Sequence, residues 1–170
     1  TDEGSNNLFS ITSCTEDVLK LGMIPSKKVV VSELVNANVK RAKALEITTS
    51  DNVYMIGRIL YADKEPLNYT LTFVPEKIFP GLSKYDLKEE SLYRIITEVY
   101  GVKITKARRT IEAIGAQDEI AEYLDIEEGT PIILFRCITY GIVNGRKIPI
   151  ENFKCYYRTD KFKFYIDQVR

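Results

Sequence analysis

A serine and a tyrosine at the start of an apolar helix are the first candidates for chemistry. Ser91 precedes Leu92 and Tyr93, and apolar residues recur at helical spacing from there to Tyr100. Unpaired backbone N–H groups and a hydroxyl at a helix start form a favourable site for an anion. Serine is also a common N-cap, and a cap satisfies those groups without a ligand. Ser91 is therefore either part of an anion site or an ordinary cap.

An arginine inside an apolar strand is the second candidate. Arg58 lies in the run 55–60, where the other residues are apolar or glycine. A guanidinium group binds phosphate or carboxylate through paired N–H donors. A three-residue turn after this strand would place Arg58 opposite Thr70, on the polar side of the next strand, whereas a two-residue turn would not. Arg58 is thus a ligand-binding arginine or an edge-strand charge that faces solvent.

The last hairpin of the chain places charged residues on a face that is otherwise apolar or amphipathic. It turns on Asn144-Gly145, the strongest short hairpin signal. If Val143 pairs with Arg146, even positions of the first strand share a face with odd positions of the second. That face holds Ile132, Leu134, Arg136, Ile138, Glu151, Phe153, Cys155 and Tyr157.

Three interpretations of this face stay open. Buried charges persist when they are paired or bind a ligand. The face is therefore a polar ligand site, or it carries a structural ion pair between Arg136 and Glu151, or it is open to water. The same assumed strand pairing puts Cys137 and Cys155 on opposite faces of the hairpin, which argues against a disulfide between them.

The residue types that are missing exclude several classes of enzyme. There is no histidine, which removes Ser-His-Asp and Cys-His catalysis and every metal site that needs an imidazole. The three cysteines, Cys14, Cys137 and Cys155, include no CxxC pair. We therefore expect reduced thiols, no metal and no cofactor. Phosphate-binding glycine loops and the nucleophile-elbow motif are also absent from the sequence.

Charge and hydropathy argue against nucleic acid or a membrane as a direct partner. Lysine plus arginine and aspartate plus glutamate number 24 each, so that the formal net charge is zero. A neutral domain has no overall field that draws it onto DNA or an anionic lipid surface. No apolar run approaches the roughly 20 residues that span a bilayer, and no signal peptide is visible. We expect a cytoplasmic protein.

The apolar pattern predicts strands in consecutive hairpins with helices between them. Strands are expected over 28–39, 53–62, 67–73, 102–114, 131–143, 146–158 and 161–169. Helices are expected before Gly22, from 39 to 45, over 91–100 and over 117–124. Along 67–73 the odd-numbered residues are apolar and the even-numbered ones polar, so that this strand has two distinct faces. The fold class is α+β with a largely antiparallel sheet.

The 170 residues suit one domain. Residues 1–8 have little apolar content and are expected to form a disordered lead-in or tag, followed by one domain over 9–170. The chain begins with a threonine, which suggests a fragment of a longer protein or the remnant of a tag.

The ordered set of short motifs resembles the UTRA domain, the ligand-binding domain of GntR-type bacterial transcription regulators of the HutC subfamily. The resemblance covers nearly the whole chain, and it rests on the order and spacing of the motifs. The matching residues are Ile11-Thr12-Ser13, Glu16-Asp17, Gly22, Arg58, Glu65-Pro66, Phe79-Pro80-Gly81-Leu82, Ser91-Leu92-Tyr93, Tyr100-Gly101, Ala121 to Leu124, Gly129-Thr130-Pro131, Thr139-Tyr140, Asn144-Gly145, Glu151 and Tyr157 to Phe162.

This resemblance implies a chorismate-lyase-like fold, usually in a homodimer, that binds a small-molecule effector. Family proteins carry an N-terminal winged-helix domain that contacts operator DNA, and this chain contains no such domain. The ligand must favour one dimer arrangement over another for any signal to pass. The implied function is an effector-binding and dimerisation domain of a transcription regulator, in most cases a repressor.

The resemblance also assigns roles to residues. In members that bind phosphosugars, an arginine of the first central strand and the serine and tyrosine of the S-L-Y motif hold the phosphate. A glutamate and a tyrosine of the late hairpin hold the sugar. These roles fall here on Arg58, Ser91, Tyr93, Glu151 and Tyr157, with Ser13 as an additional phosphate contact.

Two positions depart from the phosphosugar-binding pattern. Leu60 stands where a second arginine is common. Thr70, which is also a candidate ligand-binding residue, stands where a glutamate is common. A phosphosugar remains the first expectation for the ligand. The alternatives are a chorismate-lyase-type enzyme of the same fold, which would also hold an anion with arginines, and an interaction domain without a ligand.

Overall fold

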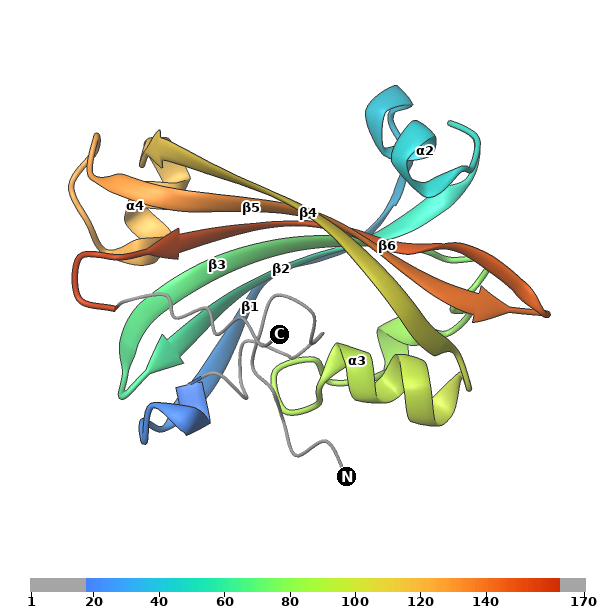
Figure 1. Cartoon of the computed structure of the whole chain (residues 1–170), viewed down its shortest axis with the longest axis horizontal. Coiled ribbons are helices and arrows are strands. Elements are labelled where there is room, and N and C mark those ends of the chain that lie inside the picture. Colours follow the sequence, from blue (N-terminus) through green and yellow to red (C-terminus); the bar gives the residue numbers. More distant parts are fainter. Residues whose placement is uncertain (1–17, 163–170) are drawn as a thin grey trace, which may run out of the picture.

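The computed structural model of the protein describes residues 18–162, which form a six-stranded antiparallel sheet with helices on both faces (Figure 1). The strands lie in the order β1-β2-β3-β6-β5-β4. Their bounds are β1 (Pro25–Asn36), β2 (Asn52–Ala62), β3 (Glu65–Pro75), β4 (Lys103–Gly115), β5 (Pro131–Val143) and β6 (Arg146–Arg158). The helical elements are α2 (Val39–Leu45), η1 (Leu82–Lys84), α3 (Leu92–Arg94), η2 (Ile95–Val99) and α4 (Asp118–Leu124). The predicted α+β class is confirmed.

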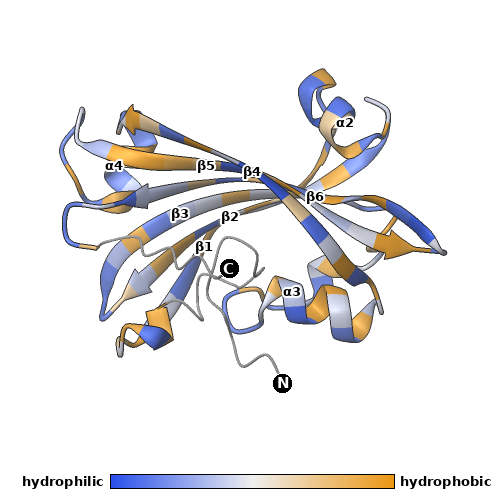
Figure 2. Ribbon diagram, viewed as in Figure 1, coloured by the Kyte–Doolittle hydropathy of each residue, from blue (hydrophilic) through white to orange (hydrophobic). Residues whose placement is uncertain are grey.

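The two faces of the sheet have different covers. The face that packs against α3 and η2, here called the inner face, contributes to two apolar clusters. The opposite, outer face packs against α4 at one end and α2 at the other. Figure 2 shows apolar and hydrophilic bands alternating along the strands, as expected when each face has its own neighbours.

Both hairpin turns have two residues. The Asn144-Gly145 turn has positive φ at both positions, as predicted, and Val143 pairs with Arg146. The earlier turn, Asp63-Lys64, also has positive φ at both positions, although neither residue is a glycine. Two-residue turns of this twist match the twist of the flanking strands.

A β-bulge follows each turn and shifts the pairing by one residue. In the first hairpin Tyr61 pairs with Pro66 but Leu60 pairs with Asn68, so that Leu67 is the extra residue. In the second hairpin Tyr140 pairs with Pro149 but Thr139 pairs with Glu151, so that Ile150 is extra. Leu67 and Ile150 are both buried in the inner-face clusters. A bulge places two residues of one strand opposite one residue of the other.

The bulges overturn part of the expected side-chain arrangement. Beyond Ile150 the odd residues of β5 share a face with the odd residues of β6, so that Arg136 lies on the outer face, away from Glu151. The expected Arg136–Glu151 pair is therefore wrong, and Arg136 instead pairs with Glu112 at 2.7 Å. Cys137 shares a face with Cys155, contrary to the expectation, and the two thiols form no disulfide.

The same effect changes the position of Leu67. The alternation along β3 predicts that Leu67 shares a face with Tyr69, but the bulge turns Leu67 to the inner face. Tyr69, Leu71 and Phe73 keep to the outer face, where they contact the α4 and α2 clusters. The polar side of β3 therefore faces α3.

The best predicted helix, 91–100, is present but is not a uniform α-helix. One turn of α-helix, α3, is followed by the π-helical turn η2. Ser91 has extended backbone angles, and its Oγ accepts a 3.4 Å hydrogen bond from Arg94 N, which makes it the N-cap. Short π-helical segments widen a helix by one residue and are frequent at functional sites. The strand expected over 161–169 lies mostly outside the described residues.

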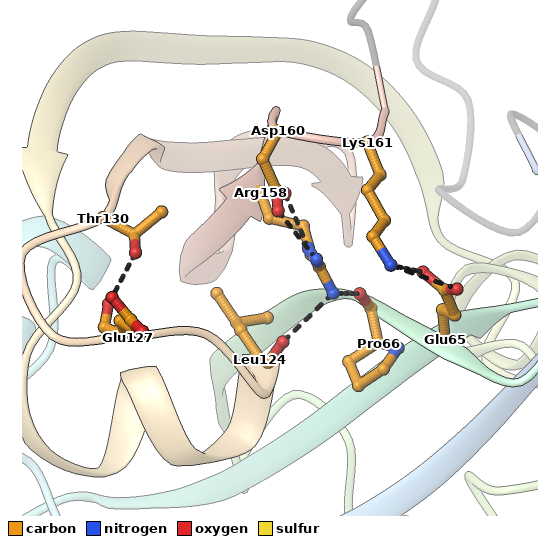
Figure 3. Close-up of polar contacts among 8 residues, drawn as sticks. All are labelled: Glu65, Pro66, Leu124, Glu127, Thr130, Arg158, Asp160 and Lys161. Atoms are coloured by element: carbon orange, nitrogen blue, oxygen red, sulfur yellow. Dashed lines mark hydrogen bonds and ion pairs between the residues drawn. The ribbon is translucent and has the colours of Figure 1, made fainter.

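A buried arginine joins the end of β6 to two other parts of the chain (Figure 3). The Nε and Nη2 atoms of Arg158 each donate a 2.8 Å hydrogen bond to one carboxylate oxygen of Asp160. Its Nη1 donates to the backbone carbonyls of Pro66 and Leu124, at 3.2 Å each. Three of the motifs on which the family resemblance rests therefore meet at one guanidinium.

Candidate functional site

A band of polar side chains crosses the inner face between its two apolar clusters. Arg58 of β2 pairs with Thr70 of β3, which in turn pairs with Cys155 of β6. Asn68 and Thr72, two residues to either side of Thr70, share its face because side chains alternate along a strand. The two-residue turn and the Leu67 bulge together produce the Arg58–Thr70 pairing that a three-residue turn would have given.

A buried carboxyl group anchors the other end of this band. Glu151 is 2% exposed, and its Oε1 accepts hydrogen bonds from Tyr93 Oη at 2.9 Å and from Thr139 Oγ1 at 3.0 Å. Burial raises the pKa of Glu151, although the two hydrogen bonds and the charges of Arg58 and Arg109 oppose that rise. Burial also raises the pKa of Tyr93. This contact ties α3 to β6.

The start of α3 is fixed from the sheet edge. Lys27 of β1 donates a 2.9 Å hydrogen bond from Nζ to the backbone carbonyl of Glu90, the residue before Ser91. Burial lowers the pKa of Lys27, and the positive charge of Arg58 lowers it further. Arg58 therefore lies within electrostatic reach of both Lys27 and Glu151.

A cleft of about 1090 Å³ runs beside α3 and η2, from the start of β1 to the start of β4. Its wall includes Ser91 and Tyr93 from the helix side and Lys27 from β1. Clefts of several hundred to about 1,000 Å³ are typical of small-molecule sites. The cleft thus has the size for a metabolite, and the hydroxyl and amine groups of these residues give it hydrogen-bonding capacity.

Two buried polar groups on the inner face have spare hydrogen-bonding capacity. Asn68 is 1% exposed and Thr72 is fully buried, and neither Asn68 Nδ2 nor Thr72 Oγ1 has a hydrogen-bond partner among residues 18–162. Asn68 uses its Oδ1 to accept a 3.4 Å hydrogen bond from Thr70. An unsatisfied buried polar group costs about 1–3 kcal/mol, so each such group calls for water or a ligand.

Over the same stretch, no group of acidic, cysteine or histidine side chains has the arrangement of a metal site. Nor does any helix of residues 18–162 have the length and hydropathy needed to cross a membrane.

The model of one protein family, described as the UTRA domain, matches residues 20–163. The chain belongs to the UTRA domain family. UTRA domains are effector domains of GntR-type transcription regulators. The match therefore confirms the resemblance seen in the sequence.

Two curated relatives of this UTRA domain are repressors. The HTH-type transcriptional repressor NagR of Bacillus subtilis is 27% identical over 164 residues, which cover 95% of this chain and 66% of NagR. The mannosyl-D-glycerate transport/metabolism system repressor MngR of Escherichia coli is 27% identical over 159 residues, covering 93% and 64%. The chain thus spans about two thirds of the length of these relatives. Both names denote repressors and not enzymes, so the lyase alternative gains no support from them.

Solved structures confirm the fold of the UTRA domain. The crystal structure of the effector domain of PhnF from Mycobacterium smegmatis superposes with a TM-score of 0.86 at 22% identity, covering 96% of this chain and 99% of that one. The antiparallel sheet with helices on both faces is therefore the architecture of GntR-type effector domains, as predicted.

The structure brings six of the seven predicted site residues to one side of the UTRA domain. Ser91 and Tyr93 line the cleft itself. Arg58 and Thr70 pair on the inner face, and Glu151 lies on the same face in contact with Tyr93. The ligand-binding roles of these residues stay predictions, but their mutual placement is compatible with one site.

Tyr157 is the sixth of these residues. It is 6% exposed within an apolar cluster, where its ring meets Phe135 edge-on with centroids 6.2 Å apart. It pairs with Asn68 on the inner face and, like Arg58, it does not line the cleft. Ser13 lies outside the described residues.

Sequence reasoning missed Lys27 and Thr139. Thr139 was placed on the wrong face because the Ile150 bulge leaves no signature in the apolar alternation. Lys27 precedes the expected strand 28–39, whereas β1 begins at Pro25 and carries this lysine into the sheet. Asn68 and Thr72 had a signal, since the polar face of β3 is plain in the sequence.

Proposed function

We propose that this UTRA domain binds a small phosphorylated metabolite, with phosphosugars as the first class, in the cleft beside α3. The bound ligand would control DNA binding by a separate winged-helix domain of the whole cytoplasmic regulator. NagR and MngR, two of the relatives that match this chain, are repressors, which favours repression as the activity that the ligand modulates.

The charge of the cleft carries this proposal. Four basic side chains line it, against two acidic ones, whereas the whole chain is neutral. The basic residues are Lys27, Lys88, Arg94 and Lys103, and the acidic ones are Glu89 and Glu98. A cleft with an excess of one sign of charge concentrates ligands of the opposite sign. The ligand is therefore expected to be an anion.

The polar groups behind the cleft favour a polyhydroxylated ligand over a simple anion. Tyr93 joins the cleft wall to Glu151, and the spare donors of Asn68 and Thr72 lie on the same face of the sheet. Carboxylates, amides and hydroxyls are the groups that bind sugar hydroxyls through hydrogen bonds. MngR is named for a mannosyl compound, which agrees with a sugar-derived ligand.

We also infer that the domain works as a homodimer, because a ligand can signal only through two arrangements that it binds differently. β4 forms one edge of the sheet and is exposed along most of its length, including Ile111 at 51%. Exposed sheet edges with apolar residues favour pairing with another chain. A mass near that of one chain by light scattering at micromolar concentration would contradict this inference.

Thermal denaturation against a panel of phosphosugars tests the ligand class. The panel includes each unphosphorylated parent sugar and chorismate as controls. A ligand at about 100 times its dissociation constant adds roughly 2.7 kcal/mol of stability, which raises the melting temperature measurably. A rise with a phosphosugar but not with its parent supports the proposal. A rise with chorismate, accompanied by its consumption, would instead make this protein an enzyme.

A matched pair of serine variants then locates the ligand. Ser91→Ala removes a hydroxyl from the cleft wall, whereas Ser83→Ala removes one from an exposed position in η1. The ligand-induced rise should shrink in the first variant and persist in the second. An equal ligand-induced rise in melting temperature in both variants would show that the ligand does not bind at the start of α3.

A further inference from the structure

Basic side chains from three neighbouring strands gather on the outer face of the sheet. Lys154 of β6 pairs with Leu71, which packs against both outer-face clusters, and with Arg136 of β5. Residues that pair directly share a face, as do residues two apart on one strand. The strand pairing therefore places four cations on the outer face of β4, β5 and β6, namely Lys106, Arg108, Arg136 and Lys154.

Helix α2 brings two more cations to the same place. The guanidinium carbon of Arg41 lies 3.8 Å from the centre of the Phe73 ring, which belongs to the outer-face cluster under α2. Lys40 is exposed, and its charge, like that of Arg41, acts on Lys154. The six residues are here called the basic face: Lys40, Arg41, Lys106, Arg108, Arg136 and Lys154.

Few carboxylates balance the charge of the basic face. β4, β5 and β6 contain two acidic residues, Glu112 and Glu151, and Glu151 lies on the inner face. Glu112 forms an ion pair with Arg136 at 2.7 Å. Helix α2 contains no acidic residue. The basic face thus has one carboxylate among its six cations, although the whole chain is neutral.

Three of the six cations have no direct counterion in the described part of the chain. Lys40, Arg108 and Lys154 form no ion pair among residues 18–162. Lys154 is half-buried. Burial lowers its pKa, and the like charges of Arg136, Lys40 and Arg41 lower that pKa further. Like charges held close together repel one another, and a bound anion removes that repulsion.

The acidic residues near this side of the sheet gather at its other end. Six carboxylates and no basic residue lie between Asp118 and Glu128, in α4 and the turn after it. Figure 1 shows α4 and α2 over opposite ends of the outer face. Attraction at one end and repulsion at the other direct a polyanion to the basic face.

Duplex DNA is the polyanion that best fits the basic face. The chain belongs to a family of regulator domains, and its relative NagR is an HTH-type transcriptional repressor, so that DNA is the polymer on which such proteins act. Three adjacent strands span about 10 Å, and DNA carries a negative charge at about every 1.7 Å of its axis. Lysine and arginine side chains spread over such a distance bind several backbone phosphates at once.

We propose that the basic face contacts the phosphate backbone of duplex DNA without reading its base sequence. This contact goes beyond the proposed function, because it adds to the DNA binding of the separate winged-helix domain and uses none of the residues of the cleft beside α3. The sequence contains no run of basic residues that predicts it, since the fold assembles the face from α2, β4, β5 and β6.

Fluorescence anisotropy of a labelled duplex tests this contact on the whole chain at pH 7.5. With roughly four phosphate contacts, we expect binding at about 20 mM NaCl that weakens with salt, with a slope of log K against log salt of about −3.6. A second duplex of unrelated sequence should bind with the same affinity. A wild-type chain that binds neither duplex at this low salt would overturn the proposal.

A matched pair of variants locates the contact. Arg108→Gln removes one exposed positive charge from the basic face, whereas Lys84→Gln removes one from η1, which packs against the inner face. We expect DNA affinity at low salt to fall about tenfold in the first variant, with a salt slope smaller by about 0.9, and to stay unchanged in the second. Equal losses in both variants would mean that net charge alone matters, which would overturn the assignment to this face.

Lys154→Met tests the half-buried member of the basic face. Because Lys154 lies among like charges, its replacement by an apolar side chain of similar length should not lower the melting temperature. A DNA affinity about tenfold weaker in a variant with an unchanged or raised melting temperature supports the proposal. Wild-type DNA affinity in this variant would show that Lys154 takes no part in the contact.

Acidic proteins and a second copy of the chain are the other partners that the charges allow. Poly-glutamate that binds as tightly as the duplex, at equal concentration of charge, would show a face for acidic peptides and overturn the proposal. Loss of a dimer in Arg108→Gln, seen by light scattering, together with unchanged DNA affinity would assign the face to contact between copies. A failed phosphosugar panel leaves the basic face untouched, and absence of DNA binding leaves the proposed function standing.

Discussion

The hydroxyl of Tyr93 donates a 2.9 Å hydrogen bond to Oε1 of Glu151, and this contact joins the wall of the cleft to the centre of the sheet. Glu151 is buried and Tyr93 is partly buried, and Thr139 donates to the same carboxyl oxygen. A ligand that donates to Oε1 of Glu151 in place of Tyr93 would therefore move the side chain of Tyr93. Such a replacement couples ligand binding to the position of α3.

Removal of this hydroxyl should destabilise the fold. Tyr93→Phe leaves a buried carboxyl oxygen with one donor fewer, which we expect to cost about 1–3 kcal/mol of unfolding free energy. Urea denaturation measures the loss. Tyr85→Phe, a change in a partly buried tyrosine of the same cluster, is the control and should stay within about 0.5 kcal/mol. Equal effects in the two variants would mean that the contact with Glu151 contributes little.

The buried carboxyl of Glu151 should make stability depend on pH. Because burial raises its folded pKa above the unfolded value of about 4.5, its contribution is most favourable below that value and is lost as pH rises through the folded pKa. Glu151→Gln cannot ionise, so its stability relative to wild type should improve between pH 4 and pH 7. Urea denaturation of both proteins across that range checks the trend. A constant difference would show that the carboxyl titrates normally.

Asp160 should give the opposite pH dependence. Its hydrogen bonds from Arg158 lower its pKa from 3.8 to about 2. The stabilisation is therefore present above pH 3.8 and is lost as pH falls through about 2. The unfolding curve of Asp160→Asn should change less than that of wild type over this interval. Glu122→Gln, on the exposed side of α4, should behave as wild type.

Gly141 is a position where a methyl group has no room. A Cβ there would lie 2.7 Å from Val102 Cγ1 and 3.1 Å from the carbonyl oxygen of Lys103. Gly141→Ala should destabilise the protein by about 1–3 kcal/mol, as overpacking does. Gly115→Ala is the control, because its Cβ would make ordinary contacts of 3.5 Å or more. Thermal unfolding of the two variants should differ clearly, and similar melting temperatures would argue against the tight packing at Gly141.

Arg58 is the residue whose loss should affect ligand binding most. Arg58→Ala is expected to weaken the binding of a phosphorylated ligand by about 1.5–3 kcal/mol, the range for a charge-assisted hydrogen bond. Arg146→Ala, at the exposed hairpin turn, removes the same charge from a residue that does not line the cleft. Calorimetry with the ligand found in the panel compares them. Wild-type affinity in the Arg58 variant would show that this arginine does not contribute to ligand binding.

Much of the fold follows from local patterns in the sequence. Asn144-Gly145 fixes one turn because both positions need positive φ, and the apolar spacing after Ser91 identifies the helix. The alternation along β3 separates a polar face from an apolar one, and that polar face does lie beneath α3. These features can be predicted from the sequence because each is determined by residues that are close in sequence.

The side-chain pairing across strands was harder to predict. Arg58 faces Thr70 because a two-residue turn is followed by a bulge at Leu67, and the sequence alone allowed two pairings. The second bulge, at Ile150, brings Thr139 and not Ile138 beside Glu151. A bulge is stabilised by the packing of its extra residue against distant parts of the fold. No local pattern therefore marks it.

The departure at Leu60 has a similar explanation. In the sequence, Leu60 stands where a second arginine is common, so that this strand has one cation fewer. In the sheet, Lys27 lies directly across from Leu60 on the neighbouring strand. A charge that is absent from one strand can be present at the paired position of the neighbouring strand, and only the pairing of the two strands shows this.

The two bulges also bear on how this domain tolerates changes in length during evolution. Loss of one codon within most of a strand would turn every later side chain of that strand to the other face. Loss of Leu67 or Ile150 alone would leave the remaining pairs, Leu60 with Asn68 and Thr139 with Glu151, opposite one another. The cost would be an apolar side chain removed from a cluster, and the polar band would keep its arrangement. Within β3 and β6, a one-residue deletion is therefore best tolerated at these two positions.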